Sequence, residues 1–171
     1  MISDFKVLRK KARIGSTGLP TLKVALLGDT ATQFLAVALK GIGLERGYNL
    51  DLFEADYNQV ERQLLDTTSE LHDFNAEYII VFQSTHKLLT TFNKMDPEQQ
   101  SLLADQRVEF VKNITAVTDR KLIYFNYPEI EDTIFGSYSN KVESSFTYQV
   151  RKLNVSLMDI SRDNPNLFIC D

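Results

Sequence analysis

Apolar residues along this chain form short continuous runs that alternate with longer stretches in which they recur every three or four positions. Short runs bounded by glycine or polar residues are typical of buried strands, and the longer periodicity is typical of amphipathic helices. The runs that we predict as strands are residues 22–27, 50–53, 77–82, 121–125 and 166–170. The stretches that we predict as helices are residues 30–46, 57–65, 86–118 and 146–160.

Local signals refine two of these elements. In the region 86–118 we expect a break near Met95, because Asp96-Pro97-Glu98-Gln99 places an N-cap, a proline at the first helical position and glutamine at the third. Residues 126–141 carry turn-forming pairs and are predicted as a loop. In the last helix the apolar positions fall on one face: Phe146, Val150, Leu153, Leu157 and Ile160.

The first dozen residues form a separate element. They predict a short basic amphipathic helix with Phe5, Leu8 and Ala12 on one side, followed by a breaker segment from Gly15 to Pro20. A basic helix suits a membrane surface, but this one has few large apolar groups, which favours an arm that packs on the domain. We therefore divide the chain into an arm and linker at residues 1–20 and an α/β domain at residues 21–171.

Five strands alternating with helices predict a three-layer α/β/α fold around a five-stranded parallel sheet. Right-handed crossovers make the flavodoxin-like order 2-1-3-4-5 the simplest arrangement. In such sheets ligands bind beyond the carboxyl ends of the strands. The predicted site therefore comprises Gly28, Asp29 and Thr30, Ala55 to Tyr57, Gln83 to His86, Asn126 and Tyr127, and Asp171.

Composition narrows the class of protein. The 171 residues are 43% hydrophobic and 25% charged, with a net charge of −4, so we expect a soluble globular domain. The acidic balance argues against nucleic-acid and anionic-membrane partners. Cys170 is the one cysteine, no apolar run is long enough to span a membrane, and the first residues lack the apolar core of a signal peptide. These features predict a cytoplasmic location.

The triplet Gly28-Asp29-Thr30 carries the strongest chemical suggestion. Glycine allows a tight turn, and a threonine hydroxyl at a helix start is able to present a nucleophile or bind an anion, although the same triplet also simply caps a helix. His72 and His86 are interpreted as structural or solvent-exposed, and no ligand spacing predicts a metal site in this chain. Amides and hydroxyls that suit a hydroxylated ligand gather around the predicted site: Tyr57, Asn58, Gln83, Ser84, Asn126, Tyr127 and Asn140.

The strand–Gly-Asp-Thr–helix pattern resembles the first sequence block of the SGNH hydrolases, where Thr30 takes the place of the serine nucleophile. The other blocks differ. Ala55-Asp56-Tyr57 replaces the glycine of the second block, and Gln83-Ser84-Thr85 replaces the asparagine of the third. Asp171 falls where the aspartate of Asp-x-x-His is expected, but no histidine follows it here. The resemblance implies an SGNH-like fold with a degraded catalytic set.

A closer resemblance covers residues 20–171 and is to the amino-terminal domain of FkbH-like proteins. The segments that carry it are LLGDTATQFL at 26–35, YNQVERQLLD at 57–66, SEL at 69–71, FGSY at 135–138 and RKLN at 151–154. These proteins join such a domain to a HAD-type phosphatase or transferase domain in polyketide or sugar pathways, for instance to load a glyceryl group onto an acyl carrier protein. The resemblance implies a longer protein, with Mg²⁺ bound only by the HAD domain.

Two hypotheses follow for function. In the first, the domain is an inactive binding module for a small hydroxylated or acyl substrate, or for an acyl carrier protein, and it assists a HAD domain in cis. Gly28, Tyr57, Gln83, Ser84 and Asn126 would bind the ligand. In the second, the domain is an active esterase or acyltransferase, in which Thr30 attacks with Asp29 and Asp171 in supporting roles. The loss of two hydrolase blocks favours the first hypothesis.

Overall fold

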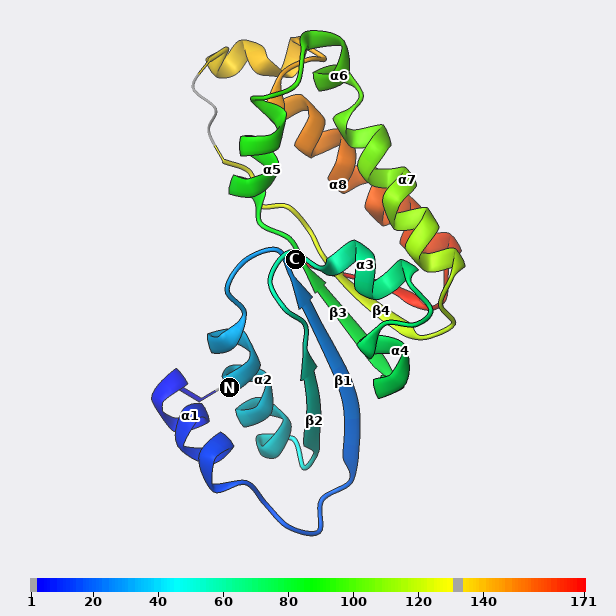
Figure 1. Cartoon of the computed structure of the whole chain (residues 1–171). Coiled ribbons are helices and arrows are strands. Elements are labelled where there is room, and N and C mark those ends of the chain that lie inside the picture. Colours follow the sequence, from blue (N-terminus) through cyan, green and yellow to red (C-terminus); the bar gives the residue numbers. More distant parts are fainter. Residues whose placement is uncertain (1–2, 131–133) are drawn as a thin grey trace. The chain divides into compact units, whose positions relative to one another are not determined.

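A computed structural model describes residues 3–130 and 134–171 of the chain. The chain divides into two compact units, Met1–Val81 and Phe82–Asp171, which are described separately below (Figure 1). Residues 131–133, inside the predicted loop 126–141, and residues 1–2, at the start of the predicted arm, lie outside the described residues.

The five strands hydrogen-bond in the order β2-β1-β3-β4-β5, which confirms the predicted α/β fold and sheet order. Strands β1 and β2 run parallel, with Thr21 opposite Asn49 and Leu26 opposite Glu54. Strands β4 and β5 are also parallel, with Leu122 opposite Leu167. Parallel pairing requires a crossover between the strands, and the intervening helices supply it.

In the first unit, each predicted strand and helix is present with ends that differ by a few residues, and the structure adds a short helix at Glu70–Phe74 (Figure 1). Strand β1 is its core, since Val24 to Leu27 are buried, as expected for a strand covered on both faces. The elements are α1 (Phe5–Ile14), β1 (Thr21–Gly28), α2 (Gln33–Glu45), β2 (Asn49–Glu54), α3 (Val60–Leu65), α4 (Glu70–Phe74) and β3 (Tyr78–Phe82), whose last residue belongs to the second unit.

Helix α1 packs on α2, as predicted for a packing arm, and Figure 1 shows the two helices side by side. Leu8 is buried, and Phe5 meets the ring of Phe34 edge-on at 5.8 Å between centroids. The approach is close because Gly41 has no side chain: a Cβ there would lie 2.6 Å from the carbonyl oxygen of Leu8. Lys11 also pairs with Glu45 across the contact at 2.8 Å.

The second unit contains the predicted break in the long helical region. Asp96 caps α6 by accepting a hydrogen bond from the Gln99 amide at 2.8 Å, and Pro97 is the first residue of the helix. The elements are α5 (Thr85–Phe92), α6 (Pro97–Ser101), α7 (Leu103–Ala116), β4 (Lys121–Phe125), the 3₁₀-helix η1 (Gly136–Lys141), α8 (Phe146–Asp163) and β5 (Leu167–Cys170).

A buried glutamine ties three of these helical segments together. Gln149, on α8, is fully buried, and its Oε1 accepts a hydrogen bond from the Ala104 amide at 2.8 Å. Its Nε2 donates to the carbonyl oxygens of Ser101 and Glu143 at 2.9 and 2.7 Å. Both ends of the side-chain amide are therefore satisfied, and they satisfy backbone groups at the start of α7 and the end of α6.

Three sequence predictions of helix position were wrong. Helix α2 begins at Gln33 rather than Thr30, and α3 begins at Val60 rather than Tyr57, because both segments open with turn residues that continue the preceding loop. The short helix α4, which contains His72, was not predicted from the sequence. None of the helices in the described residues combines the length and apolarity needed to cross a membrane.

Candidate functional site

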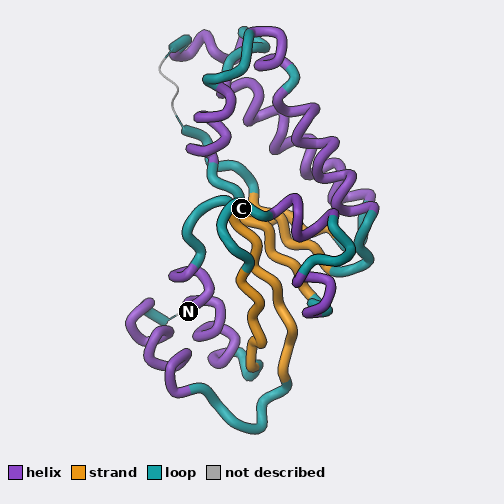
Figure 2. Tube along the Cα trace, viewed as in Figure 1, coloured by secondary structure: helices purple, strands orange, loops and turns teal. Residues whose placement is uncertain are grey.

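The Gly28-Asp29-Thr30 segment ends β1 and enters a loop rather than a helix. Gly28 is the last, buried residue of the strand, and Asp29 and Thr30 are half-buried in the loop that precedes α2, drawn teal in Figure 2. The expectation that Thr30 lies at a helix N-terminus is therefore wrong, since Thr32 occupies the N-cap position. The helix dipole that we expected to act at the Thr30 hydroxyl belongs to residues further along the chain.

Thr32 and Glu54 form a polar contact in the same unit that the sequence analysis did not identify. Thr32 is buried, with 6% of its surface exposed, and its hydroxyl donates to Glu54 Oε2 at 2.8 Å. The contact joins the loop after β1 to the end of β2. The loop is therefore held by the side chain of Thr32, which lies two residues beyond the Gly28-Asp29-Thr30 triplet.

Tyr57 lies in the turn between β2 and α3 and is 62% exposed. Its neighbour Asn58 has a positive φ of 63°, a conformation that asparagine tolerates better than most residues. Tyr57 is therefore presented by a tight turn rather than by the first turn of a helix, as we had expected.

In the second unit, the predicted residues Gln83 and Ser84 directly follow β3. Ser84 is the N-cap of α5 in extended conformation, and Gln83 is half-buried. The next residue, Thr85, is 3% exposed, and its hydroxyl oxygen has no hydrogen-bond partner in the described part of the chain. His86 is exposed on the first turn of α5.

Two further predicted residues contact each other at the ends of β4 and β5. Asn126 donates from Nδ2 to Asp171 Oδ1, and its backbone amide donates to the carbonyl oxygen of Cys170 at 2.9 Å. The side-chain oxygen of Asn126 is buried without a partner among the residues that the structure describes. An unpartnered buried acceptor is uncommon and is a place where a ligand donor fits.

Four polar side chains of the second unit form a connected cluster, which we call the Arg107 cluster: Gln83, Arg107, Tyr124 and Tyr127. Gln83 Oε1 accepts from the hydroxyls of Tyr124 at 2.7 Å and Tyr127 at 3.2 Å. It also accepts from Arg107 Nη2, and the two hydroxyls lie 2.9 Å apart. Both tyrosines are 1% exposed, whereas Gln83 and Arg107 retain part of their surface in solvent.

The protonation states in the Arg107 cluster follow from burial. Burial raises the pKa of Tyr127 well above its ordinary value, so this phenol keeps its proton. Burial on its own lowers the pKa of Arg107, but the negative charges that Tyr127 and Tyr124 acquire when they ionise, together with their hydrogen bonds to Arg107, outweigh it, and the net shift is upward. The cluster therefore carries one full positive charge at neutral pH.

The surrounding structure fixes the position of Tyr127. The Tyr127 amide donates to Asn154 Oδ1 at 3.1 Å, and Asn154 Nδ2 donates back to the Tyr127 carbonyl oxygen at 2.8 Å. Asn154 lies on α8, so this pair of bonds anchors the segment after β4 to that helix.

The sequence analysis selected Gln83 and Tyr127 but missed Arg107 and Tyr124. Tyr124 lies inside the apolar run of β4, a position that is typical of a core residue. Arg107 had a usable signal, because it follows the helical spacing of Ala104, Val111 and Ile114, which form the buried face of α7. A cation on such a face needs a polar partner.

No set of three metal-ligating side chains lies together in residues 3–130 and 134–171. His72 is exposed on α4, and Cys170 is a half-buried free thiol.

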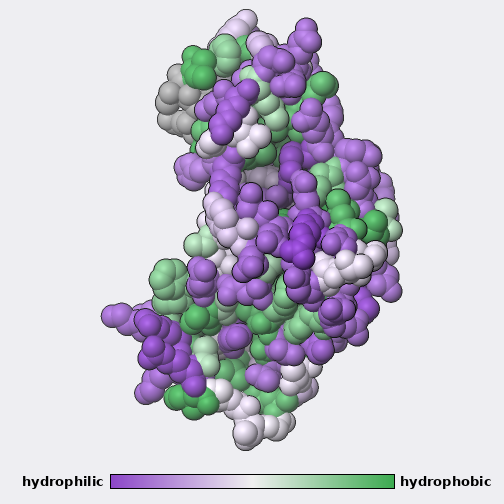
Figure 3. Space-filling model, in the orientation of Figure 1, coloured by the Kyte–Doolittle hydropathy of each residue, from purple (hydrophilic) through white to green (hydrophobic). Residues whose placement is uncertain are grey.

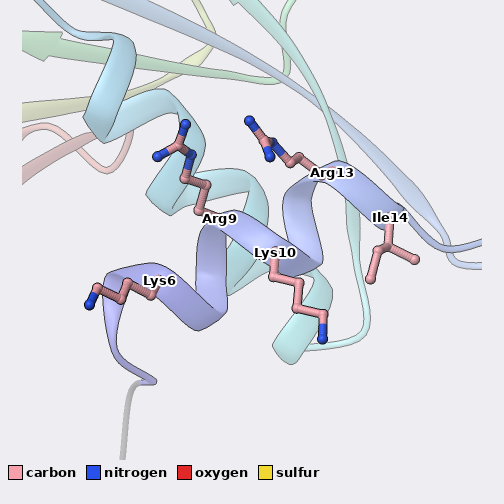
Figure 4. Close-up of a pocket in the computed structure, with 5 residues that line it drawn as sticks. All are labelled: Lys6, Arg9, Lys10, Arg13 and Ile14. Atoms are coloured by element: carbon pink, nitrogen blue, oxygen red, sulfur yellow. The ribbon is translucent and has the colours of Figure 1, made fainter.

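A separate cationic hollow of about 440 Å³ lies on α1, in the first unit. Lys6, Arg9, Lys10 and Arg13 recur along one stripe of the helix, and Ile14 completes the lining (Figure 4). Figure 3 shows this helix as a strongly hydrophilic part of the surface. The hollow contains none of the site residues predicted from the sequence.

A family model described as "FkbH, N-terminal domain" matches residues 23–171, which leaves α1 outside the matched range. A solved structure superposes with a TM-score of 0.96 at 53% sequence identity: the crystal structure of the N-terminal part of the protein BF1531 from Bacteroides fragilis, containing a phosphatase domain complexed with Mg. The match covers 99% of this chain and 45% of that one. No curated protein matches the chain.

Proposed function

Because the chain belongs to the FkbH N-terminal domain family, we propose that it is a substrate- or carrier-binding module that serves a Mg²⁺-dependent HAD-type phosphatase or transferase domain of the same protein. The related B. fragilis structure supports this pairing, since its description includes a phosphatase domain and Mg. In this proposal the fold is SGNH-like, and the ligand is a small hydroxylated or acyl compound, presented free or on an acyl carrier protein in a cytoplasmic pathway.

The observation that carries the proposal is the set of polar groups that follow β3, β4 and β5 in the second unit. Gln83, Asn126 and Asp171 each come directly after a strand, where ligands of parallel α/β sheets bind. Asn126 touches Asp171 and keeps a buried carbonyl oxygen without a partner in the described residues. Neutral amides of this kind recognise hydroxyl groups by hydrogen bonding.

The geometry at Thr30 favours binding over hydrolysis. A threonine nucleophile needs an adjacent base and benefits from a helix N-terminus, and Thr30 lies in the loop ahead of the Thr32 N-cap. Asp29 and Gly28 then shape the end of β1 and do not activate a nucleophile. If Thr30→Ala removed turnover of p-nitrophenyl acetate by this protein, the esterase hypothesis would replace the proposal.

Thermal unfolding in the presence of three- to six-carbon polyols, sugars and acetyl-coenzyme A tests the proposal. A ligand at about 100 times its dissociation constant stabilises the fold by about 2.7 kcal/mol, which raises the melting temperature of a chain of this size by roughly 5–10 °C. We expect at least one compound to do so, and Asn126→Ala to remove the effect.

The matched control is Asn113→Ala, at an exposed position of α7. It should respond to the ligand as the unmodified chain does. A panel without any stabilising compound, or a stabilisation that Asn126→Ala leaves intact, contradicts a binding site at the ends of β4 and β5.

A further inference from the structure

Arg107 is a partly buried cation without a counter-charge in the described part of the chain. Its Nη2 donates to the neutral oxygen of Gln83 and, at 3.4 Å, to the hydroxyl of Tyr124. One face of the guanidinium is covered by the ring of Phe110, at 4.5 Å from the centroid. No carboxylate of residues 3–130 and 134–171 forms an ion pair with it, although buried charges are generally paired.

Arg107 also keeps one buried hydrogen-bond donor without an acceptor in the part of the chain that the structure describes. Arg107 Nη2 and the hydroxyls of Tyr124 and Tyr127 all lie within hydrogen-bond distance of Gln83 Oε1, and the two hydroxyls also bond each other, so these groups satisfy one another. Arg107 Nε is buried and has no acceptor among the described residues. Of the five N–H donors of this arginine, the Nε–H is therefore buried and unsatisfied within residues 3–130 and 134–171.

The missing counter-charge and the missing acceptor for Nε have one chemical solution. An oxyanion supplies a negative charge and two or more acceptor oxygens, and the planar guanidinium fork fits a carboxylate or a phosphate in a bidentate manner. Gln83 and Arg107 are only half-buried, which gives a small ligand a way in.

We propose that the Arg107 cluster is a binding site for the oxyanion group of a small metabolite, either a carboxylate or a phosphate. This inference rests on the proposed function, because it names the charged group of the ligand that the module binds. Arg107 holds the anion directly. Gln83 orients the guanidinium through Nη2, and the hydroxyls of Tyr124 and Tyr127 fix Gln83 in turn.

A substitution at Gln83 tests the proposal directly. Gln83→Glu keeps the shape of the side chain and its acceptor oxygen, and it places a carboxylate beside Arg107. The new carboxylate then pairs with Arg107 and takes the place of the anionic group of the ligand. We expect this variant to unfold at a higher temperature than the unmodified chain in the absence of anions, and to have lost its response to them.

The test is thermal unfolding with increasing inorganic phosphate or acetate, with sodium chloride holding the ionic strength constant. We expect phosphate or acetate to raise the melting temperature of the unmodified chain, and whichever acts identifies the group. The apparent dissociation constant should rise at least tenfold in Arg107→Met and in Gln83→Glu. Arg162→Met, which removes an exposed arginine of α8, is the control and should titrate as the unmodified chain does.

The inference is overturned if neither anion stabilises the unmodified chain, if Gln83→Glu responds to anions as strongly as the unmodified chain, or if Gln83→Glu unfolds at a lower temperature in their absence. Neutral polyols distinguish the two proposals. If a polyol stabilises the chain and anions do not, the oxyanion site is disproved and the proposal of a binding module stands. If no compound in the panel stabilises the chain, both proposals are disproved.

Discussion

At the scale of single residues, two side-chain amides of α8 hold the second unit together. Gln149 satisfies the Ala104 amide and two carbonyl oxygens at once, and Asn154 satisfies both backbone groups of Tyr127. A residue that pairs several buried backbone groups is costly to remove, because each group left unpaired costs about 1–3 kcal/mol.

Gln149→Leu should therefore lower the free energy of unfolding by about 3 kcal/mol, since leucine fills the space but leaves buried backbone groups without partners. Urea denaturation measures the difference. Gln106→Leu, at an exposed position of α7, is the control and should change stability by less than about 0.5 kcal/mol. Equal stabilities for the two variants would contradict the role given to Gln149.

Position in the strand pattern alone selected part of the candidate site. Gln83, Asn126 and Asp171 were found because parallel strands end at one edge, so position in the strand pattern was enough. The contact of Thr32 with Glu54 was not predictable in this way, because it depends on where α2 begins, and helix starts are poorly marked when no side-chain cap is present. Arg107 was not predicted, because a charged residue interrupts the apolar pattern that marks the buried face of α7.

At the scale of elements, the contact between α1 and α2 combines close backbone approach with an ion pair.

Strands were predicted well because continuous apolar runs and parallel burial coincide, as in β1 and β4. The short elements α4 and η1 were not predicted, because five- and six-residue segments contain too few turns for a periodic pattern.

Gly41→Ala should destabilise the first unit by about 1–3 kcal/mol, since the new methyl group meets the backbone of Leu8 and one helix has to shift. Thermal or urea unfolding followed by circular dichroism measures the change. Lys40→Ala alters the neighbouring exposed residue and should have little effect. A Gly41→Ala protein as stable as the Lys40→Ala protein would show that α1 does not approach α2 this closely.

The pair of Lys11 and Glu45 predicts a specific dependence on pH. The hydrogen bond from Lys11, followed by one from Ser3, lowers the pKa of Glu45 from 4.5 to about 2. A carboxyl group with a lowered pKa stabilises the fold above its unfolded value of about 4.5, and this contribution is lost as the pH falls through about 2.

Lys11→Met should therefore be less stable than the unmodified chain near pH 6, and the difference should shrink between about pH 4.5 and 2. Unfolding free energies measured across this range test the expectation. Lys10→Met is the control, because it removes a neighbouring cation of the α1 hollow that forms no ion pair with the described residues. If the difference in unfolding free energy between Lys11→Met and the unmodified chain stays constant from pH 6 to pH 2, the pair of Lys11 and Glu45 does not form.

At the scale of the whole molecule, the family relationship and the polar groups after β3, β4 and β5 support one account. The chain belongs to the FkbH N-terminal domain family and spans 45% of the B. fragilis chain that it matches, whose description includes a phosphatase domain. In our proposal, recognition of the substrate lies in this chain and phosphate chemistry lies in the partner domain. Variants of the binding residues should then affect substrate affinity and spare the chemical step.

The most direct measurement is steady-state phosphate release by the complete native protein carrying Asn126→Ala, with Asn113→Ala as control. Polyol phosphates serve as recognised substrates, and p-nitrophenyl phosphate serves as a substrate that needs no recognition. We predict that Asn126→Ala raises KM for a polyol phosphate at least tenfold, while kcat and the hydrolysis of p-nitrophenyl phosphate stay unchanged. The same KM in both variants, or an equal loss with both substrates, would contradict a binding role for this chain.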